Sequence, residues 1–447
     1  MNAASAILRP YLEGFKTLET APAGNAPAWL AGLRRDAFAR FADRGFPGER
    51  HEDWKYTSTR PLEKRAFSLA TSAHGSVSAS DIAPILLHEM PVHTLVFVNG
   101  NPVAALSTVS SAIRGLRISS LTQALERNAD VLQPYLMPDS VWADDSFTAL
   151  NTAFLKDGVV VDIDAKSKLD RSLQLIFVST QQTSSLACHP RILVRLGNDS
   201  QATLIETYFG LEGAANFTNS YTQIVLGENT RLEHLRVQRE SLGDFHVSRV
   251  HVSQQGGSSY LAHTLNLGGL WVRTDLQARL EAPLAEAVFN GLYAVNGRQH
   301  VDNHTRIDHL APATRSSELY RGIIGGHARA VFNGKVVVAK HAIKTDAAQT
   351  NNNLLLSRTA EIDAKPELEI YADDVQCSHG ATIGQLDEQA LFYLRSRGLD
   401  LQTARALLVE AFSLKLMERI PAPELRAYAA RQIKTVLPRQ SAAAEWT

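Results

Sequence analysis

The segment 300–309 carries a dense set of side chains that could bind a metal ion. It reads His-Val-Asp-Asn-His-Thr-Arg-Ile-Asp-His, and on a strand His300, Asp302 and His304 would share one face. Imidazole and carboxylate groups together make sites for iron, manganese or zinc. The alternative is a polar outer face with hydrogen-bonded histidines. We favour that alternative, because no characteristic metal-binding spacing accompanies the three residues.

A second candidate lies in the segment 373–380, Asp-Asp-Val-Gln-Cys-Ser-His-Gly. Cys377 and His379 are two residues apart, so on an extended chain both face one cavity or one partner. Thiolate and imidazole are ligand types used in iron–sulfur chemistry. A buried cysteine beside a structural histidine explains the pair equally well. Its position, where predicted strands give way to predicted helices, adds weight because such boundaries are frequent interface sites.

Other combinations of reactive side chains are weaker. Cys188 and His189 are adjacent, so on a strand they point to opposite faces, and we interpret them as structural. The glycines near Gly334 make no P-loop, because Lys335 is followed by valine and not by serine or threonine. No Gly-x-Ser-x-Gly elbow occurs. Asp373 and Asp374 suggest a glycosidase pair, but adjacent carboxylates on a strand diverge.

The middle of the chain has the texture of a long series of strands. Turn sequences such as Gly-Asn-Asp at 197–199 and Gly-Glu-Asn at 227–229 separate them at intervals of roughly ten residues. The runs rich in β-branched residues are Val159–Ile163, Leu173–Val178, Ile192–Leu196, Ala202–Thr207, Gln223–Leu226, Leu232–Gln238, Val247–Val252, Tyr260–Leu265, Leu276–Leu280, Ala287–Leu292, Val331–Val338 and Glu367–Tyr371. Either a large sandwich or a β-solenoid could result.

The length of this series favours the solenoid. A sandwich holds about 7 to 9 strands in roughly 100 residues, and this run is longer on both counts. A solenoid stacks coils, each of which buries its apolar face against its neighbours. Strict repeat motifs are absent, so periodicity alone leaves the sandwich open.

Helical patterns flank the strands on both sides. Apolar residues at helical spacing predict a helix over Trp29–Phe41 that ends by Gly45, and another over Leu121–Leu132, with a strand at His93–Val98 between them. Three more helices are predicted over 386–397, 401–419 and 424–436. We therefore predict three parts: a helical or mixed domain over 1–150, a β core over 151–384 and a helical domain over 385–447.

Composition excludes several classes of protein. The 447 residues carry 45 Lys plus Arg against 46 Asp plus Glu, and no basic stripe stands out, so a nucleic-acid partner is not expected. Two cysteines give no disulfide framework. No apolar h-region precedes Phe15, and no stretch approaches the roughly 18 apolar residues of a membrane span. A cytoplasmic location is the expectation.

Several longer motifs together resemble one family. Near the N-terminus, Glu-Asp-Trp-Lys-Tyr-Thr at 52–57 resembles a segment of the SufB/SufD proteins of the SUF iron–sulfur cluster assembly system. Further similar motifs are Asn-Gly-Leu-Tyr at 290–293, His-Val-Asp-Asn-His-Thr at 300–305, Ser-Glu-Leu-Tyr-Arg-Gly at 317–322, Phe-Asn-Gly-Lys at 332–335, and the stretches 346–356 and 365–382. The resemblance is strongest over about 285–420, and the low cysteine count is similar to the SufD branch.

The resemblance implies a fold and a function. It implies a right-handed parallel β-helix flanked by helical domains, in a non-enzymatic scaffold subunit that pairs with a SufB-like paralogue through the β-helix and with a SufC-like ATPase through the C-terminal helices. It maps the family's functional histidine onto His379, with Cys377 as a weaker candidate. One chain with two cysteines cannot supply four thiolates, so no cluster is permanently bound and a transient cluster or iron is shared with a partner. A homodimer of the isolated chain stays open.

Two competing functions remain at this stage. One is a carbohydrate-active enzyme on a parallel β-helix, suggested by the strand texture and by Asp373. The other is a small metal-binding protein that acts alone through His300, Asp302 and His304. We rank the scaffold first, because the chain lacks nucleotide-binding and nucleophile motifs and matches the family over long segments.

Overall fold

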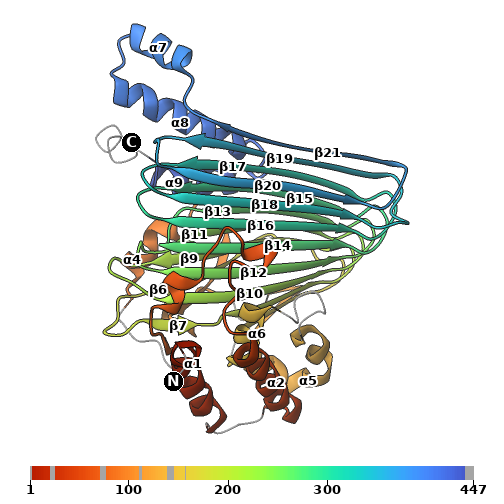
Figure 1. The fold of residues 1–447 in the computed structure, drawn as a ribbon. Helices are drawn as coiled ribbons and strands as arrows, with labels where there is room; N and C mark the ends of the chain where they lie inside the picture. The colour runs from red at the N-terminus through yellow and green to blue at the C-terminus, as the bar shows by residue number, and fades with distance from the viewer. Residues whose placement is uncertain are drawn as a thin grey trace.

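The chain folds around a long stack of parallel strands with helices attached near both of its ends (Figure 1). The structure is a computed structural model, and it describes residues 3–20, 26–70, 77–109, 113–137, 145–156 and 158–437. The last ten residues of the predicted C-terminal domain, 438–447, therefore lie outside the described residues.

Two sheets form the core, and from β8 to β21 the chain passes from one sheet to the other with each strand. Sheet A holds β1 (Ser68–Leu69), β4 (Leu116–Ser120), β5 (Gly158–Ile163), β7 (Leu186–Cys188), β8 (Arg191–Leu196), β10 (Phe217–Leu226), β12 (Phe245–Gln254), β14 (Trp271–Leu280), β16 (His300–His309), β18 (Arg329–Val338) and β20 (Glu361–Ile370). Sheet B holds β2 (Val92–Val98), β3 (Asn101–Pro102), β6 (Ser172–Ser179), β9 (Gln201–Gly210), β11 (Arg231–Arg239), β13 (Ser259–Asn266), β15 (Glu286–Val295), β17 (Arg315–Ile324), β19 (Thr345–Leu355) and β21 (Val375–Gly384).

This alternation makes the core a β-solenoid. From β8 to β20 in sheet A, and from β6 to β21 in sheet B, each strand pairs in parallel with the strand one coil later. The chain turns between strands at residues such as Asn229 (φ 54°) and Gly257 (φ 67°), whose types tolerate the left-handed region. The solenoid predicted from the strand texture and the family resemblance is confirmed, and the sandwich is excluded.

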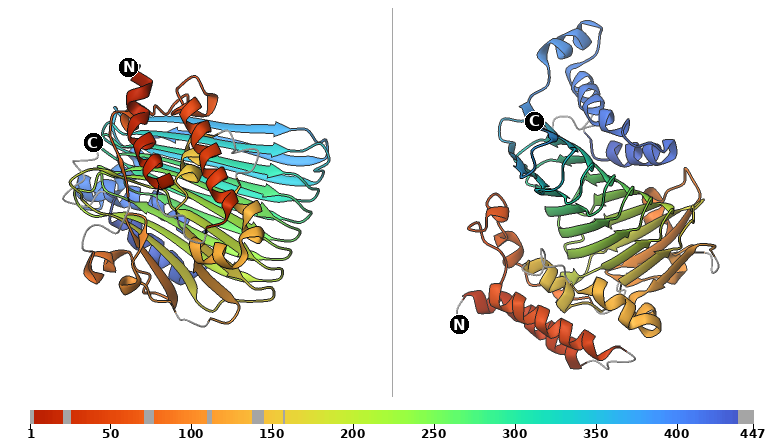
Figure 2. Two further views of the ribbon diagram at one scale, coloured as in Figure 1. Left: turned by 90° about the horizontal axis from the view of Figure 1, so that it is seen from below. Right: turned by 90° about the vertical axis from the view of Figure 1, so that its right-hand side faces the viewer.

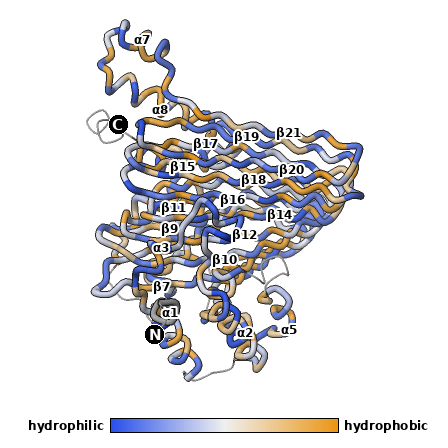
Figure 3. Tube along the Cα trace, in the orientation of Figure 1, coloured by the Kyte–Doolittle hydropathy of each residue, from blue (hydrophilic) through white to orange (hydrophobic). Residues whose placement is uncertain are grey.

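Hydrophobic and hydrophilic residues are interspersed along the strands (Figure 3), as expected where successive side chains point alternately into and out of the solenoid. Inside, apolar residues of successive coils stack, as in the ring pairs Phe97–Phe177 and Phe177–Tyr208, each with centroids 4.9 Å apart. Polar residues also point inward: Glu206 accepts hydrogen bonds from the Tyr208 hydroxyl at 2.8 Å and pairs with His234 Nε2 at 3.1 Å. These partners offset the cost of burying a carboxylate.

Helices cover the outer faces of the two sheets. They are α1 (Ala3–Thr20), α2 (Ala28–Arg44), η1 (Glu52–Trp54), α3 (Arg60–Glu63), α4 (Ala79–Ile82), η2 (Ala83–Ile85), η3 (Ala104–Leu106), α5 (Leu121–Leu136), α6 (Ser146–Ala153), α7 (Glu388–Ser396), α8 (Leu401–Met417) and α9 (Pro423–Lys434). Leu30 of α2 and Leu125 of α5 belong to one apolar cluster with Val160 and Leu193 of sheet A. α8 and α9 pack on sheet B. The two groups of helices lie toward opposite ends of the stack (Figure 2).

Most predicted elements are confirmed, with instructive differences. The helix at 29–41 is α2, ended by Gly45 at φ 66°, and α7 to α9 match the three C-terminal predictions within a few residues. Strands β17 and β19 lack β-branched runs and escape the sequence pattern, because polar residues occupy their inward positions. Strands β2 and β4, within the predicted 1–150 domain, belong to the core sheets. The division at residue 150 itself stays a prediction.

The helices of the described segments include none long and apolar enough to cross a membrane.

Candidate functional site at the last coil

The last coil of the solenoid consists of β20 and β21. Each pairs on one side only among the described residues, β20 with β18 and β21 with β19. Their inward-facing side chains are partly open to solvent, since no further coil of this chain lies beyond them. Ile383, for example, points inward in register with Asn353 and is still 54% exposed. The structure thus presents two strand edges and an unfilled interior at one end.

Cys377 and His379 both lie on β21 and both face this interior. Cys377 pairs in register with Ala347 and His379 with Gln349, two inward residues of β19. His379 is exposed, whereas Cys377 is half-buried beside an apolar cluster that includes Val336 and Ala347. Burial, together with the charge of Asp346, raises the pKa of the Cys377 thiol. The ring of His379 is therefore the accessible group of the two, and the ligand role of either stays a prediction.

His300, Asp302 and His304 lie two strands away from β20, on the outer face of β16 and not in the open interior. Asp302 Oδ2 accepts hydrogen bonds from Thr57 Oγ1 at 2.6 Å and from Arg273 Nη1 at 2.8 Å. His304 Nε2 lies 3.1 Å from Asp302 Oδ1. Although burial favours the neutral acid, the charges of His304 and Arg273 hold the pKa of Asp302 well below its usual range. Within the described segments, no three His, Cys, Asp or Glu side chains are arranged to hold a metal ion.

One partner of Asp302, Thr57, belongs to the Glu-Asp-Trp-Lys-Tyr-Thr segment, which lies against the outer face of sheet A. Trp54 stacks on Trp271 with ring centroids 6.3 Å apart, and the Arg273 guanidinium lies 3.9 Å from the Trp54 ring centroid. Further along, Glu52 pairs with Lys365 of β20 at 2.7 Å. His300 Nε2 also lies 3.0 Å from Thr57 Oγ1, so His300 and Asp302 both join the N-terminal segment to the solenoid. The choice between a polar face and a metal site stays a prediction.

The glycines of the family motifs make room for large side chains inside the solenoid. A Cβ atom on Gly291 would lie 2.1 Å from the Tyr320 ring, and one on Gly322 would lie 2.3 Å from the Tyr293 ring. A Cβ on Gly334 would lie 2.1 Å from Nε2 of Gln349, which reaches across from the opposite sheet. These motifs therefore specify how successive coils pack against one another.

Glu318 and Gln349 form a buried polar pair directly behind the last coil. Gln349 Nε2 donates to Glu318 Oε2 at 2.6 Å, and the two residues are 2% and 3% exposed. Burial raises the pKa of Glu318 to about 7, against the opposing hydrogen bonds of Gln349 and Thr305. Neither residue is among the candidates that the sequence motifs predict. A signal was present in the sequence: Glu318 lies two residues before Tyr320, so on a strand both side chains point to the same, inward face of the solenoid.

The remaining candidates do not lie on the inner face of the last coil. Burial raises the pKa of the Cys188 thiol to about 12 and lowers the pKa of His189 to about 3, in keeping with their structural interpretation. Asp373 and Asp374 lie exposed between β20 and β21. The argument against a glycosidase pair assumes that both residues lie on a strand, where adjacent side chains diverge. That assumption is wrong, because the chain turns there to enter the last strand.

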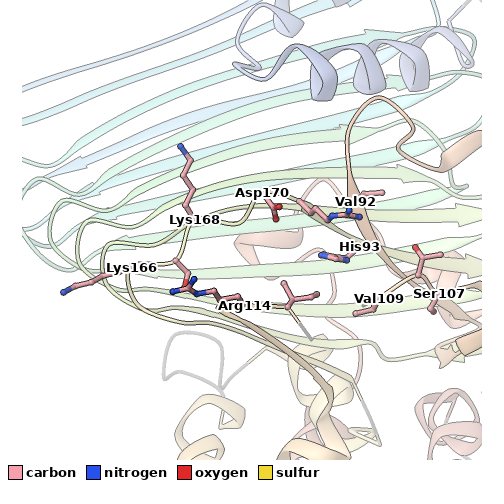
Figure 4. A pocket seen from close by; sticks show the side chains of 12 residues that line it. Val92, His93, Ser107, Val109, Arg114, Lys166, Lys168 and Asp170 are labelled. Carbon is pink, nitrogen blue, oxygen red and sulfur yellow. The ribbon is translucent and has the colours of Figure 1, made fainter. Parts of the chain in front are cut away.

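Cavities also occur elsewhere on the surface of the described residues, and two of them bear on the sequence candidates. One, of about 750 Å³, lies between the N-terminal segment and the outer face of sheet A, where Trp54, Arg273 and His304 line it. The other, of about 960 Å³, lies by the first coils and is lined by Arg114, Lys166, Lys168, Asp170 and Arg171, among others. Figure 4 shows Lys166 and Lys168 pointing in different directions. The cations of this second cavity therefore do not converge on one point.

The C-terminal helices present apolar side chains to solvent. Phe392 and Tyr393 of α7 are 75% and 55% exposed, and Leu407 of α8 is 43% exposed. Figure 1 shows α7 projecting away from the solenoid. A helical projection that exposes neighbouring aromatic side chains has the composition of a protein–protein contact.

Comparison with known proteins agrees with these features. The family model "SUF system FeS cluster assembly, SufBD core domain" matches residues 177–412, and "SufBD protein N-terminal region" matches residues 6–175. The SufBD family protein slr0076 of Synechocystis is 33% identical over 411 residues, which cover 90% of each chain. The iron–sulfur cluster assembly protein SufD of Escherichia coli is 32% identical over 396 residues, 88% of this chain and 90% of that one. SufD of Bacillus subtilis is 24% identical over 406 residues, 88% of this chain and 91% of that one.

The solenoid, the motif glycines that space its coils, and these matches over nearly the whole chain lead to one conclusion: the protein belongs to the SufBD family of the SUF iron–sulfur cluster assembly system.

Proposed function

We propose that this chain is a non-enzymatic scaffold subunit that pairs with a SufB-like paralogue through the open last coil of its solenoid. Iron or a nascent iron–sulfur cluster is the cargo of this interface and is not a resident cofactor of the chain. His379 supplies one ligand from this side, with Cys377 as the weaker alternative, and the paralogue supplies the rest. A cytoplasmic location is part of the proposal.

The observation that carries the proposal is the unfilled end of the solenoid in a member of this family. Unpaired strand edges invite another chain to pair with them. In the described part of the chain, β20 and β21 are half-buried or exposed along their whole length, and their inward residues are partly open to solvent. A second solenoid placed against this end would cover Ile383 and Ile370 and would enclose His379. The same end could join two copies of the isolated chain.

The C-terminal helices are the proposed docking site for a SufC-like ATPase. Phe392 and Tyr393 provide exposed aromatic surface, and aromatic residues often dominate the binding energy of interfaces. α8 contacts β15 and β17 of the solenoid, so a movement imposed on the helices could be transmitted to the core. ATP-driven movement would in this way change the interface near His379.

No observation favours a carbohydrate-active enzyme as a second function. Among the described residues, the acidic pair that suggested it lies in an exposed turn. The carboxylates that line the cavity of about 750 Å³ include Glu52, Asp145, Asp275 and Glu367, and each of these four forms an ion pair with Arg249, Arg273 or Lys365. The family match points to cluster assembly instead.

Copurification tests the assembly. The tagged chain, expressed with the SufB-like and SufC-like proteins of its own organism, should retain both on an affinity column and through gel filtration. A variant with Phe392→Ala and Tyr393→Ala should lose the ATPase and keep the paralogue. If neither protein is retained by the wild-type chain, the proposed function is wrong.

The role of His379 is tested in the assembled complex. His379→Ala should lower the amount of iron and sulfide retained after anaerobic reconstitution, whereas Cys377→Ser should have a smaller effect. His327→Ala is the matched control, because His327 is an exposed histidine in the turn between β17 and β18. Equal iron and sulfide content in the three complexes would remove both residues of β21 from the site.

A further inference from the structure

Three residues on successive strands of sheet B form a ladder that ends at the candidate ligand. Glu318 of β17 pairs in register with Gln349 of β19, and Gln349 pairs in register with His379 of β21. In a parallel sheet, residues in register on neighbouring strands point to the same face, and neighbouring strands are about 4.8 Å apart. All three side chains therefore point into the solenoid, one above another.

The middle residue of this ladder is held from two sides. Its amide Nε2 donates to Glu318 Oε2 at 2.6 Å, and the same amide lies so close to Gly334 that a Cβ atom there would be 2.1 Å from Nε2. Above its pKa of about 7, Glu318 is a carboxylate whose oxygens can only accept, so it takes the N–H side of the amide. The carbonyl oxygen of Gln349 is thereby turned away from Glu318.

That carbonyl oxygen lacks a partner. The Gln349 residue is only 2% exposed, and within the described residues its Oε1 atom accepts no hydrogen bond. A buried acceptor left without a donor costs about 1–3 kcal/mol. The next residue of the ladder toward the open end is His379. Its imidazole carries an N–H group of the kind that the Gln349 carbonyl oxygen needs as a donor. His379 is exposed, so its ring is free to rotate toward the amide.

We propose that Gln349 is a positioning residue for His379: its Oε1 accepts the N–H of one ring nitrogen, and the other ring nitrogen is left bare toward the open end. Histidines that bind metals commonly donate their second N–H to an oxygen in this way, which fixes both tautomer and ring orientation. Glu318 acts one step further back by setting the direction of the Gln349 amide. The biological use of this arrangement rests on the proposed function, but the hydrogen bond itself does not.

The tautomer of His379 in the isolated full chain tests the inference without any partner. The chain has 15 histidines, and ¹⁵N-histidine labelling with a His379→Ala spectrum for assignment identifies the ring of interest. At pH 8 the two ring nitrogens of wild-type His379 should show one dominant tautomer. In Gln349→Leu, which keeps the volume and removes the acceptor, His379 should show the same tautomer mixture as exposed His327.

An exchanged pair provides the rescue. In the double variant Glu318→Gln with Gln349→Glu, residue 318 can donate to the new carboxylate, whose second oxygen again accepts from His379. The dominant tautomer should return in this variant. Circular dichroism and thermal unfolding confirm that each variant is folded before its spectrum is read.

The outcomes separate this inference from the proposed function. An identical His379 tautomer mixture in wild type and Gln349→Leu, or no return in the exchanged pair, overturns the positioning role and leaves partner binding untouched. If copurification fails but the tautomer follows the amide, the positioning role stands and the proposed function does not. In the assembled complex, Gln349→Leu should lower retained iron several-fold, and the exchanged pair should restore most of it.

Discussion

The covered coils of the solenoid and its last coil are built from the same kind of strand and differ in what lies against them. In the covered part, the N-terminal segment fastens to sheet A through Trp54 and Arg273, and β6 is buried along its whole length. In the last coil, β20 and β21 have the same alternation but are half-buried or exposed throughout.

The difference shows where this chain is incomplete as a folding unit. At the N-terminal end, both sheets finish with a strand antiparallel to its neighbour, β4 beside β5 and β3 beside β2. At the C-terminal end, both finish with a parallel strand whose other edge is unpaired in the described structure. This asymmetry is the reason why we propose the C-terminal end, with its exposed inward isoleucines, as the end that receives a partner.

The largest expected effect concerns the charge cluster under the N-terminal segment. Arg273 is 1% exposed and pairs with both Asp275 and Asp302, so Arg273→Leu removes the guanidinium that the two buried carboxylates share and leaves them only Arg249 at 3.6 Å and His304 at 3.1 Å. We expect the free energy of unfolding in denaturant to fall by about 3–5 kcal/mol. The matched control is Arg329→Leu near the open end, where the Arg329 side chain is 42% exposed beside Asp363 and the expected loss is below about 1 kcal/mol. Equal losses would contradict the distinction between covered and open coils.

The second prediction uses the pH dependence of stability. Burial raises the folded-state pKa of Glu318 to about 7, above the value near 4.5 of an unfolded chain. Between these values the unfolded state ionises and the folded state does not, so the free energy of unfolding falls as pH rises from about 4.5 to 7. Glu318→Gln should remove this decline, which makes the variant more stable relative to wild type at pH 8 than at pH 5. Denaturant titrations at both values measure the change, and parallel pH profiles would contradict it.

A pair of glycines sharpens the comparison further. Gly334→Ala places a Cβ 2.1 Å from Gln349, so we expect a loss of about 1–3 kcal/mol in the free energy of unfolding. Gly380→Ala on the last coil meets nothing within 4 Å and should change that free energy by less than about 0.5 kcal/mol. Thermal unfolding of the two variants provides the comparison. A larger loss at Gly380 would mean that the open end is already filled in the isolated chain.

The smallest effect on stability, and the most specific on binding, is expected at Ile383. Because Ile383 is 54% exposed, Ile383→Lys should leave the unfolding free energy within about 0.5 kcal/mol of wild type. If the paralogue covers this end, the same change buries a charge and should weaken retention of the paralogue at least tenfold. Leu284→Lys, at a residue 69% exposed in a turn, is the control that should retain it. Full retention by the Ile383 variant would move the interface elsewhere.

Part of the candidate site follows from the chain alone. The two-residue spacing of Cys377 and His379 places both on one face of a strand, and the family motifs direct attention to that strand. Sequence could not show that Cys377 turns toward an apolar cluster while His379 stays exposed, since that depends on which residues of β18 and β19 lie beside them. It also could not pair Glu318 with Gln349, 31 residues further on, because both look like ordinary polar residues of a surface strand.

The strand texture and the family motifs of the sequence, taken together, are enough to predict a β-solenoid of the SufB/SufD type. Strand texture, helix-forming ends and the long motifs sufficed, because side-chain alternation and local propensity are encoded within a few residues. Only the tertiary structure decided the roles of the polar residues. Asp302 meets Arg273 from one coil away and Thr57 from 245 residues away, so the His-x-Asp-x-His pattern that suggests a metal site also holds an N-terminal segment. The register between coils selects those neighbours, and the turns that set the register act over distances that no short motif records.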